Sequence, residues 1–241
     1  MNIRFLGRWS SNVIPGERNV SFVLDDAILF DCGPHTVASL LDGGMDPCRI
    51  ELMLISHMHM DHFAGVPELM WYRSIYKAEN RLTVIGPAGI TEATRSLLRL
   101  THTPDPWYGE QIETHVEFKE DTDTDSVRIY HAHHTIPDNA YRVEHRGGVI
   151  FYSGDTTYCS AVAEGARNAD LLVHEMTYTD EDAKLAEFWC HSTYSDAMRV
   201  FRESKAKRLI PVHLTRASSA LVSRLAGTEP GLVYPPDTLE L

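Results

Sequence analysis

The sequence has little positive charge, few cysteines and no long apolar run. Its 241 residues include 22 Lys and Arg against 34 Asp and Glu, which gives a formal net charge of −12. This acidic balance argues against a broad electrostatic surface for nucleic acid, because such a surface requires a basic face. No apolar stretch approaches the roughly 20 residues of a membrane-spanning helix, and the opening MNIRFLG has no apolar signal core. We therefore expect no membrane association.

The four cysteines indicate neither a disulfide framework nor a structural zinc site. Cys32, Cys48, Cys159 and Cys190 are widely separated and form no C-x-x-C pair. Scattered cysteines in a chain of this length are typical of a reducing compartment, and a structural zinc site normally uses close-spaced pairs. With 43% hydrophobic residues the chain can bury a full core. We expect an acidic globular protein of the cytoplasm, and its 13 histidines require an explanation.

Short apolar runs alternate with helical patterns along the chain. Strands are predicted at residues 3–6, 20–24, 28–31, 52–56, 82–85, 116–118, 127–131, 140–144, 149–153, 171–174 and 208–213. Helices are predicted at residues 67–77, 90–100, 159–168, 195–204 and 216–225. This order indicates an α/β protein with mixed sheets and covering helices. No linker or short repeat divides the sequence, so we expect residues 1–241 to form one domain.

The densest group of polar side chains is the segment Ser56-His57-Met58-His59-Met60-Asp61-His62, directly after an apolar run. In an extended chain, residues two apart project to the same side, so His57, His59 and Asp61 can converge. A turn into a helix at the following Gly65 would carry His62 to an adjacent position. Imidazole and carboxylate are ligands that zinc and similar divalent ions prefer. The segment therefore predicts a metal site.

Other predicted strands end in the same residue types. Asp155 follows one apolar run, His213 closes another, and His131, His133 and His134 follow a third. A single histidine of this kind is usually an ordinary surface or core residue. Several at strand ends beside a dense cluster favour one shared site, because such ends gather at one edge of a sheet.

Together these motifs resemble the metallo-β-lactamase superfamily, whose H-x-H-x-D-H motif stands here as His57 to His62. The resemblance covers nearly the whole chain and is strongest to the ribonuclease Z branch. It implies a four-layer αββα sandwich, with two mixed sheets packed face to face and helices on both outer faces. The matching segments are Arg18-Asn19, Leu29-Phe30-Asp31-Cys32-Gly33, Gly86-Pro87, Tyr141-Arg142, Ser153-Gly154-Asp155-Thr156, His174-Glu175-Met176-Thr177 and His191-Ser192-Thr193.

The resemblance implies a site for two divalent ions. One ion would be held by His57, His59 and His134, the other by Asp61, His62 and His213, and Asp155 would bridge them. His134 is preferred to His133 or His131 only by its spacing to Tyr141-Arg142, so the alternatives stay open. Asp31 would be a structural carboxylate near the site. Zinc suits these ligands, and manganese or iron are compatible with them.

The resemblance also implies a hydrolase in which a hydroxide bridging the two ions attacks an ester. Asp61 then counts among the catalytic residues as well as the ligands, and His191 paired with Glu175 would protonate the leaving group. The alternative for His191 is a plain helix-entry residue, with Ser192 or Thr193 capping the helix that follows. For His174 we expect a structural role.

One departure from the branch bears on the substrate. Many ribonuclease Z enzymes carry a long Gly- and Lys-rich arm that grips transfer RNA, whereas this chain has only a tight hairpin at 143–152. Without the arm, and with an acidic surface, we expect hydrolysis of a small or short phosphodiester. The alternatives are transfer-RNA 3′ processing, hydrolysis of a lactone or aryl sulfate, and a regulatory metal-binding protein with a degenerate site. Relatives of this type are commonly homodimers, so a homodimer is a family-level expectation.

Overall fold

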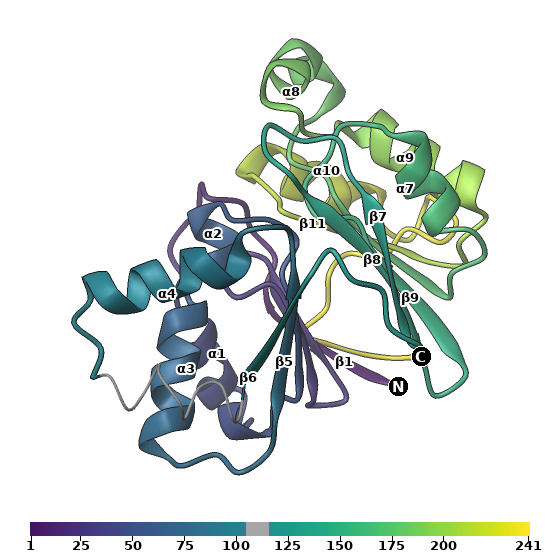
Figure 1. Ribbon diagram of the computed structural model, residues 1–241. Coiled ribbons are helices and arrows are strands. Elements are labelled where there is room, and N and C mark those ends of the chain that lie inside the picture. Colours follow the sequence, from purple (N-terminus) through teal and green to yellow (C-terminus); the bar gives the residue numbers. More distant parts are fainter. Residues whose placement is uncertain (105–115) are drawn as a thin grey trace.

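The computed structural model describes residues 1–104 and 116–241 and shows two β-sheets packed face to face between helices (Figure 1). Within the described residues, the first sheet has seven strands in the order β12-β1-β2-β3-β4-β5-β6. Strands β12, β1, β2 and β3 are antiparallel, and β3 to β6 are parallel. The strands are β1 (Asn2–Gly7), β2 (Ser21–Leu24), β3 (Ile28–Phe30), β4 (Leu52–Leu54), β5 (Leu82–Gly86), β6 (Val116–Glu120) and β12 (Thr238–Glu240).

The second sheet repeats this mixture of antiparallel and parallel pairs, in the order β11-β10-β9-β8-β7. Strands β7, β8 and β9 form an antiparallel meander, and β9, β10 and β11 are parallel. Their bounds are β7 (Val127–His131), β8 (Asn139–His145), β9 (Gly148–Tyr152), β10 (Leu171–Glu175) and β11 (Leu209–Val212).

Helices cover the outer face of each sheet (Figure 1). On the first sheet these are α1 (Thr36–Asp42), α3 (Val66–Ile75) and α4 (Ile90–Leu100), and on the second α7 (Ser160–Gly165), α9 (Tyr194–Ser204) and α10 (Arg216–Leu225). Helix α8 (Ala183–Trp189) projects from the top of the second layer, and the short α2 (Met60–Phe63) lies at the upper end of the first layer. Two 3₁₀ turns, η1 (Pro47–Arg49) and η2 (Asp180–Asp182), complete the described helical segments.

Three apolar clusters account for this layering. The central cluster combines side chains of both sheets, including Phe22, Phe30, Tyr141 and Tyr152, and it fills the space between them. The Phe22 and Phe30 rings stack with centroids 4.3 Å apart, and Tyr152 meets both edge-on. A second cluster lies under α1, α3 and α4, and a third lies under α7 and α9. Since alternate residues of each strand point to opposite faces, both faces of each sheet are buried.

The expected four-layer αββα architecture is confirmed, and all eleven predicted strands occur within two residues of their predicted ends. Helices α1, α2 and α8 and strand β12 were not predicted. Among the described helices, none combines the length and apolar character needed to cross a membrane.

The two sheets turn the carboxyl ends of their parallel strands toward one edge. Asp31 follows β3, His57 lies shortly after β4, and Asp155 lies shortly after β9. Glu175 is the last residue of β10, and His213 follows β11 directly. The topology therefore collects chemically active side chains from distant parts of the sequence into one place.

Candidate metal centre

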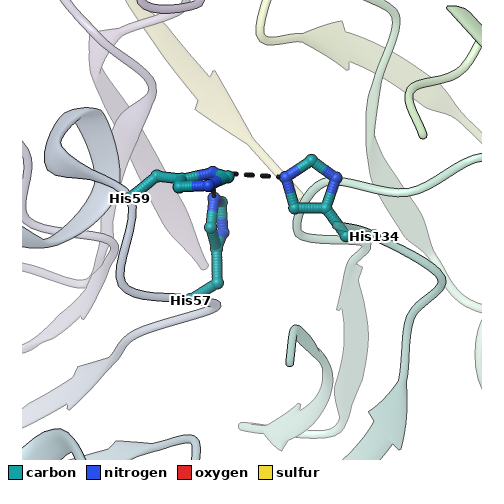
Figure 2. A group of neighbouring side chains, drawn as sticks. All are labelled: His57, His59 and His134. Carbon is teal, nitrogen blue, oxygen red and sulfur yellow. Dashed lines mark hydrogen bonds between the residues drawn. The ribbon is translucent and has the colours of Figure 1, made fainter. Parts of the chain in front are cut away.

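Three histidines from two different loops form the first cluster (Figure 2). His57 and His59 lie between β4 and α2, whereas His134 comes from the loop between β7 and β8. Nε2 of His57 is 2.9 Å from Nδ1 of His59, and Nε2 of His134 is 3.3 Å from that same Nδ1. The structure thus brings His134 to the pair, while His131 and His133 join no such cluster within the described part of the chain.

The second cluster joins Asp61 and His62 of α2 to His213. Nε2 of His213 is 3.4 Å from Oδ2 of Asp61. Helix α2 begins at Met60, so the extended segment ends at His59 and Asp61 is helical. The expectation that His57, His59 and Asp61 converge as alternate residues of an extended chain was therefore wrong for Asp61. The helical turn directs it to the second cluster instead.

Asp155 lies between the two clusters. Its Oδ2 is 3.8 Å from Nε2 of His57, 3.4 Å from Nε2 of His62 and 3.3 Å from Nε2 of His213. Its Oδ1 is buried and has no hydrogen-bond partner among the described residues. A carboxylate in this position can reach ions held by either cluster.

Each of four histidines binds a protein oxygen through Nδ1 and turns Nε2 toward the clusters. Nδ1 of His57 lies 2.8 Å from Asp138, Nδ1 of His62 lies 2.8 Å from Asp31, and Nδ1 of His213 lies 2.7 Å from the Thr177 hydroxyl. Nδ1 of His134 lies 3.1 Å from the carbonyl oxygen of Cys190. Metal-binding histidines characteristically donate their second ring N–H in this way, which fixes the tautomer and the ring orientation.

The donor set fits divalent metal. In the first cluster two Nε2 atoms face one Nδ1, and a single N–H cannot satisfy both of them, whereas a cation is bound by all three. Burial lowers the pKa of His57 to about 3 and also lowers that of His59 and His134, so these imidazoles are neutral and have free lone pairs. The Nε2 of His62 is buried without a hydrogen-bond partner within the described chain.

Electrostatics in the second cluster also favours a cation. Burial opposes charge on His62, yet Asp155 and Asp31 raise its pKa well above the usual value. Burial likewise opposes ionisation of Asp155, but the neighbouring His213 and His62 hold its pKa well below normal. Buried carboxylates that stay ionised beside imidazoles create a local demand for positive charge, which a metal ion satisfies. The chain therefore carries a divalent metal site.

A hydrogen-bonded pair lies beside the clusters. Nδ1 of His191 is 2.8 Å from Oε1 of Glu175, and Oδ2 of Asp155 is 3.9 Å from the same nitrogen. Glu175 is fully buried and also accepts hydrogen bonds from the backbone N–H of Thr156 and from the N–H and hydroxyl of Thr177. Burial lowers the pKa of His191, but the Glu175 carboxylate outweighs this and raises it to about 9.

Asp31 and His174, for which we expected structural roles, hydrogen-bond within the protein as structural residues do. Asp31 accepts hydrogen bonds from Ser56 and from the Tyr152 hydroxyl, besides its contact with His62. His174 is buried on β10, away from the clusters, and its Nδ1 donates to the carbonyl oxygen of Glu175. Thr193 caps α9 in a reciprocal capping box with Asp196, so the capping expected next to His191 also occurs.

Sequence reasoning missed Asp138 and Thr177 as partners of the site histidines. Asp138 precedes β8 and orients His57, and the Thr177 hydroxyl contacts both Glu175 and His213. The only local signal was the turn Pro137-Asp138-Asn139, which resembles any solvated turn. Only the fold brings Asp138 to His57.

Comparison with known proteins agrees with this geometry. The family model described as "Beta-lactamase superfamily domain" matches residues 26–214. Ribonuclease Z of Bacillus subtilis strain 168 is 30% identical over 275 aligned residues, which cover 89% of this chain and 88% of the relative. Ribonuclease Z of Geobacillus kaustophilus strain HTA426 is 29% identical over 272 residues, with 89% and 88% covered.

Solved structures share the fold at lower identity. The short form of human tRNase Z superposes with a TM-score of 0.81 at 24% identity, covering 100% of this chain and 99% of that one. A diphosphatase of the PhnP family gives a TM-score of 0.73 at 16% identity, covering 100% and 97%. Since the family model spans most of the chain, this protein belongs to the metallo-β-lactamase superfamily of hydrolases, in its ribonuclease Z-like branch.

Proposed function

We propose that this chain hydrolyses a small or short phosphodiester with two divalent ions, which we expect to be zinc. His57, His59 and His134 would hold one ion, Asp61, His62 and His213 the other, and Asp155 would contact both. Ions held by these groups supply Lewis acidity, which lowers the pKa of a water molecule and offsets the negative charge on the phosphate.

The observation that carries this proposal is the hydrogen-bonded pair of His191 and the buried Glu175 beside Asp155. A phosphodiester releases an alkoxide, which is a poor leaving group and requires a proton. With Nδ1 bonded to Glu175, the other ring nitrogen of His191 is free to donate that proton. A substrate oxygen can approach His191, because this side chain lines a cavity and is 14% exposed, whereas Glu175 is fully buried.

Two features support a short substrate over an extended one. The β8–β9 hairpin closes directly, with His145 paired to Gly148, so no arm extends from this position. The alignment with the Geobacillus relative spans 272 residues, more than the 241 of this chain, so that relative has residues that this chain lacks. Together with a net charge of −12, these features leave little basic surface for a long polyanion.

Transfer-RNA 3′ processing is the second candidate. It is favoured by the curated relatives named ribonuclease Z, which match this chain over nearly nine-tenths of its length. Two divalent ions would reduce the local negative charge, so an RNA end could reach the site without a basic arm.

The test is a parallel assay of the zinc- or manganese-loaded protein. The substrates are bis(p-nitrophenyl) phosphate, cyclic nucleotides, a lactone, an aryl sulfate and a transfer-RNA precursor. We expect turnover of the small phosphodiesters, and we expect it to vanish in a His213→Ala variant purified in parallel, which controls for contaminating nucleases. Robust lactone turnover with silent phosphodiesters would overturn the proposal. Efficient cleavage of the precursor alone would favour the second candidate, and silence on the whole panel would favour a regulatory metal-binding protein.

We also propose that the protein is located in the cytoplasm and forms a homodimer. A cytoplasmic location is supported by the four cysteines, all of which are free. A homodimer is the family-level expectation. Cell fractionation and light scattering of the purified protein test these two points.

A further inference from the structure

A cavity of about 430 Å³ opens beside the predicted metal ligands, and four of the residues lining it have no part in the chemistry proposed above. These are the small polar Ser11 and three large side chains, Met60, Tyr178 and Trp189. Its volume lies in the range of small-molecule sites. No lysine or arginine lines it within the described residues, so an arginine clamp on a phosphate group is not part of its construction. Parts of a substrate that lie beyond the predicted metal ligands must therefore be bound by uncharged side chains of this cavity.

Large apolar side chains are exposed at the mouth of this cavity. Met60 is 75% exposed and Trp189 is 49% exposed. Single exposed apolar residues are ordinary, but two that border the same polar cavity indicate a contact surface for a ligand. The Tyr178 ring completes this group, with its centroid 6.0 Å from that of His191. Aromatic and thioether groups bind flat rings well, through stacking and sulfur–π contacts.

The backbone holds Trp189 in a fixed relation to the catalytic groups. Trp189 is the last residue of α8, and Cys190 follows in the left-handed conformation with φ 54°. The N–H of Cys190 donates to the carbonyl of Glu187, and the N–H of His191 donates to the carbonyl of Ala186. The carbonyl of Cys190 accepts from Nδ1 of His134. One turn therefore sets the positions of the indole, the predicted acid and a predicted ligand.

The indole is also braced from outside the cavity. Phe188 packs edge-on against Trp189, with ring centroids 4.9 Å apart and planes at 88°. A rigid aromatic side chain loses little conformational entropy when a ligand binds it, which makes it an efficient contact.

We infer that Trp189, together with Tyr178 and Met60, forms a seat for a flat ring attached to the scissile phosphodiester. The substrate class is then a phosphodiester with an aromatic ring on the group that is not released, either a nucleobase or an aryl group, and not a purely alkyl diester. This inference rests on the proposed function and specifies its substrate.

The test compares three p-nitrophenyl esters that release the same leaving group, namely those of thymidine 5′-phosphate, phenyl phosphate and methyl phosphate. We expect kcat/KM to be about tenfold or more higher for a ring-bearing ester than for the methyl ester, in line with the strength of base stacking. W189A should lower kcat/KM for the ring-bearing esters about tenfold more than for the methyl ester, and W189F should retain most of the preference. The matched control is L185A, on the same helix but outside the cavity lining, which should change none of the three.

The outcomes separate this inference from the proposed function. Equal losses on all three esters in W189A, or no ring preference in the wild type, would overturn the ring seat while phosphodiester hydrolysis stands. A thymidine preference over phenyl identifies a nucleobase, and the reverse identifies an aryl group. If no ester is hydrolysed, calorimetric binding of thymidine 5′-monophosphate and methyl phosphate to the zinc-loaded protein still tests the seat. Tighter nucleotide binding that W189A abolishes supports it, and equal affinities overturn it.

Discussion

Four histidines of the site give one ring nitrogen to a protein oxygen and keep the other for the clusters. The partners are Asp138, Asp31, Thr177 and the carbonyl oxygen of Cys190. Each bond fixes the orientation of its ring, so the nitrogens that would bind metal already face the clusters before an ion arrives. Orientation at this scale therefore depends on residues that are not themselves predicted ligands.

Asp155 is the residue whose loss should disturb both clusters. Asp155→Ala is expected to lose at least one ion per chain, because its carboxylate is the described anionic group nearest to Nε2 of both His62 and His213. Elemental analysis of the purified protein measures this. Asp170→Ala is the control, since Asp170 pairs with Lys207 on the surface and should leave the metal content unchanged. Two ions retained in Asp155→Ala would refute the bridging role.

The loss of activity on removal of His191 should be larger for substrates with poorer leaving groups. For alkyl leaving groups, His191→Ala is expected to lower kcat by about 10² to 10⁴, the range of general acid catalysis. With p-nitrophenolate, which leaves without a proton, the loss should be much smaller. Steady-state rates on the two kinds of diester check this, and Glu175→Gln should show the same pattern more weakly. Equal losses on both leaving groups would mean that His191 does not protonate the leaving group.

How much of the site could be predicted depends on how local each signal is. The segment from His57 to His62 is dense enough to indicate metal from sequence alone, and strand-end positions indicated Asp155 and His213. The role of Asp138 could not be predicted, because a carboxylate in a Pro-Asp-Asn turn has an adequate local explanation. The beginning of α2 at Met60 was also missed, since the histidines there imitate the alternation of a strand.

At the scale of elements, helix α8 shows why some of the fold could not be predicted. Predicted helices were those with an apolar face, and α8 buries only Ala186 while Leu185, Phe188 and Trp189 are exposed. Its periodicity therefore lacks the core-facing stripe on which such predictions depend. Strand β12 is three residues long and is defined only by its pairing with β1. Helix α8 therefore has no core-facing pattern to recognise, and β12 depends on a tertiary pairing that no local pattern encodes.

The end of α8 gives a prediction about stability. Cys190 occupies a left-handed C-cap, which glycine adopts without strain. Cys190→Gly is expected to raise the free energy of unfolding by about 0.5 to 1 kcal/mol, measured by urea titration. Lys205→Gly is a matched control, because Lys205 has φ 56° at the end of α9, and it should give a similar gain. A loss in Cys190→Gly alone would show that contacts of the thiol outweigh backbone strain.

Asp25 links the two sheets and gives a pH-dependent prediction. Its carboxylate accepts from the N–H of Asn2 in β1 and pairs with His145 and Arg146 of the β8–β9 hairpin. Burial raises the pKa of Asp25, but these partners outweigh it and hold the pKa below its usual value. The stabilisation is therefore present above the unfolded pKa of about 3.9 and is lost as the pH falls through the lower folded value.

Asp25→Asn should consequently lower the free energy of unfolding by about 1 to 2 kcal/mol at pH 7. The difference from the wild type should stay constant down to about pH 5 and shrink below the unfolded pKa. Denaturant titrations across this range measure it. Asp26→Asn, in the same turn and 37% exposed, should change stability by less than about 0.5 kcal/mol throughout. A difference that is independent of pH would mean that the charge of Asp25 contributes nothing.

At the scale of the whole molecule, the predicted ligands come from both halves of the sandwich. His57, Asp61 and His62 follow strand β4 of the first sheet, whereas Asp155 and His213 follow strands of the second. We propose that residues 1–241 form one domain, and ions bound across the sheets would then stabilise the chain as a unit.

Removal of metal should accordingly lower the melting temperature, and the chain should still unfold in a single thermal transition. With zinc at about 100 times its Kd, one site adds about 2.7 kcal/mol, which corresponds to a Tm difference of roughly 5 to 10 °C in a chain of this length. Differential scanning calorimetry with zinc and with chelator measures this, and both scans should show one transition. Two separate transitions would contradict the single domain, and an unchanged Tm would contradict binding to the folded state.

The turn between β8 and β9 has an evolutionary consequence. Arg146 and Gly147 both have positive φ, 46° and 80°, as a two-residue type I′ connection requires. This turn lies at the far ends of two strands whose other ends lead to Asp138 and Asp155. A five-residue strand spans about 17 Å, so the turn is well separated from the chemistry. Extensions can therefore be gained or lost here without moving the reacting groups. Related hydrolases can in this way differ in the substrates that they bind while they keep the same chemistry.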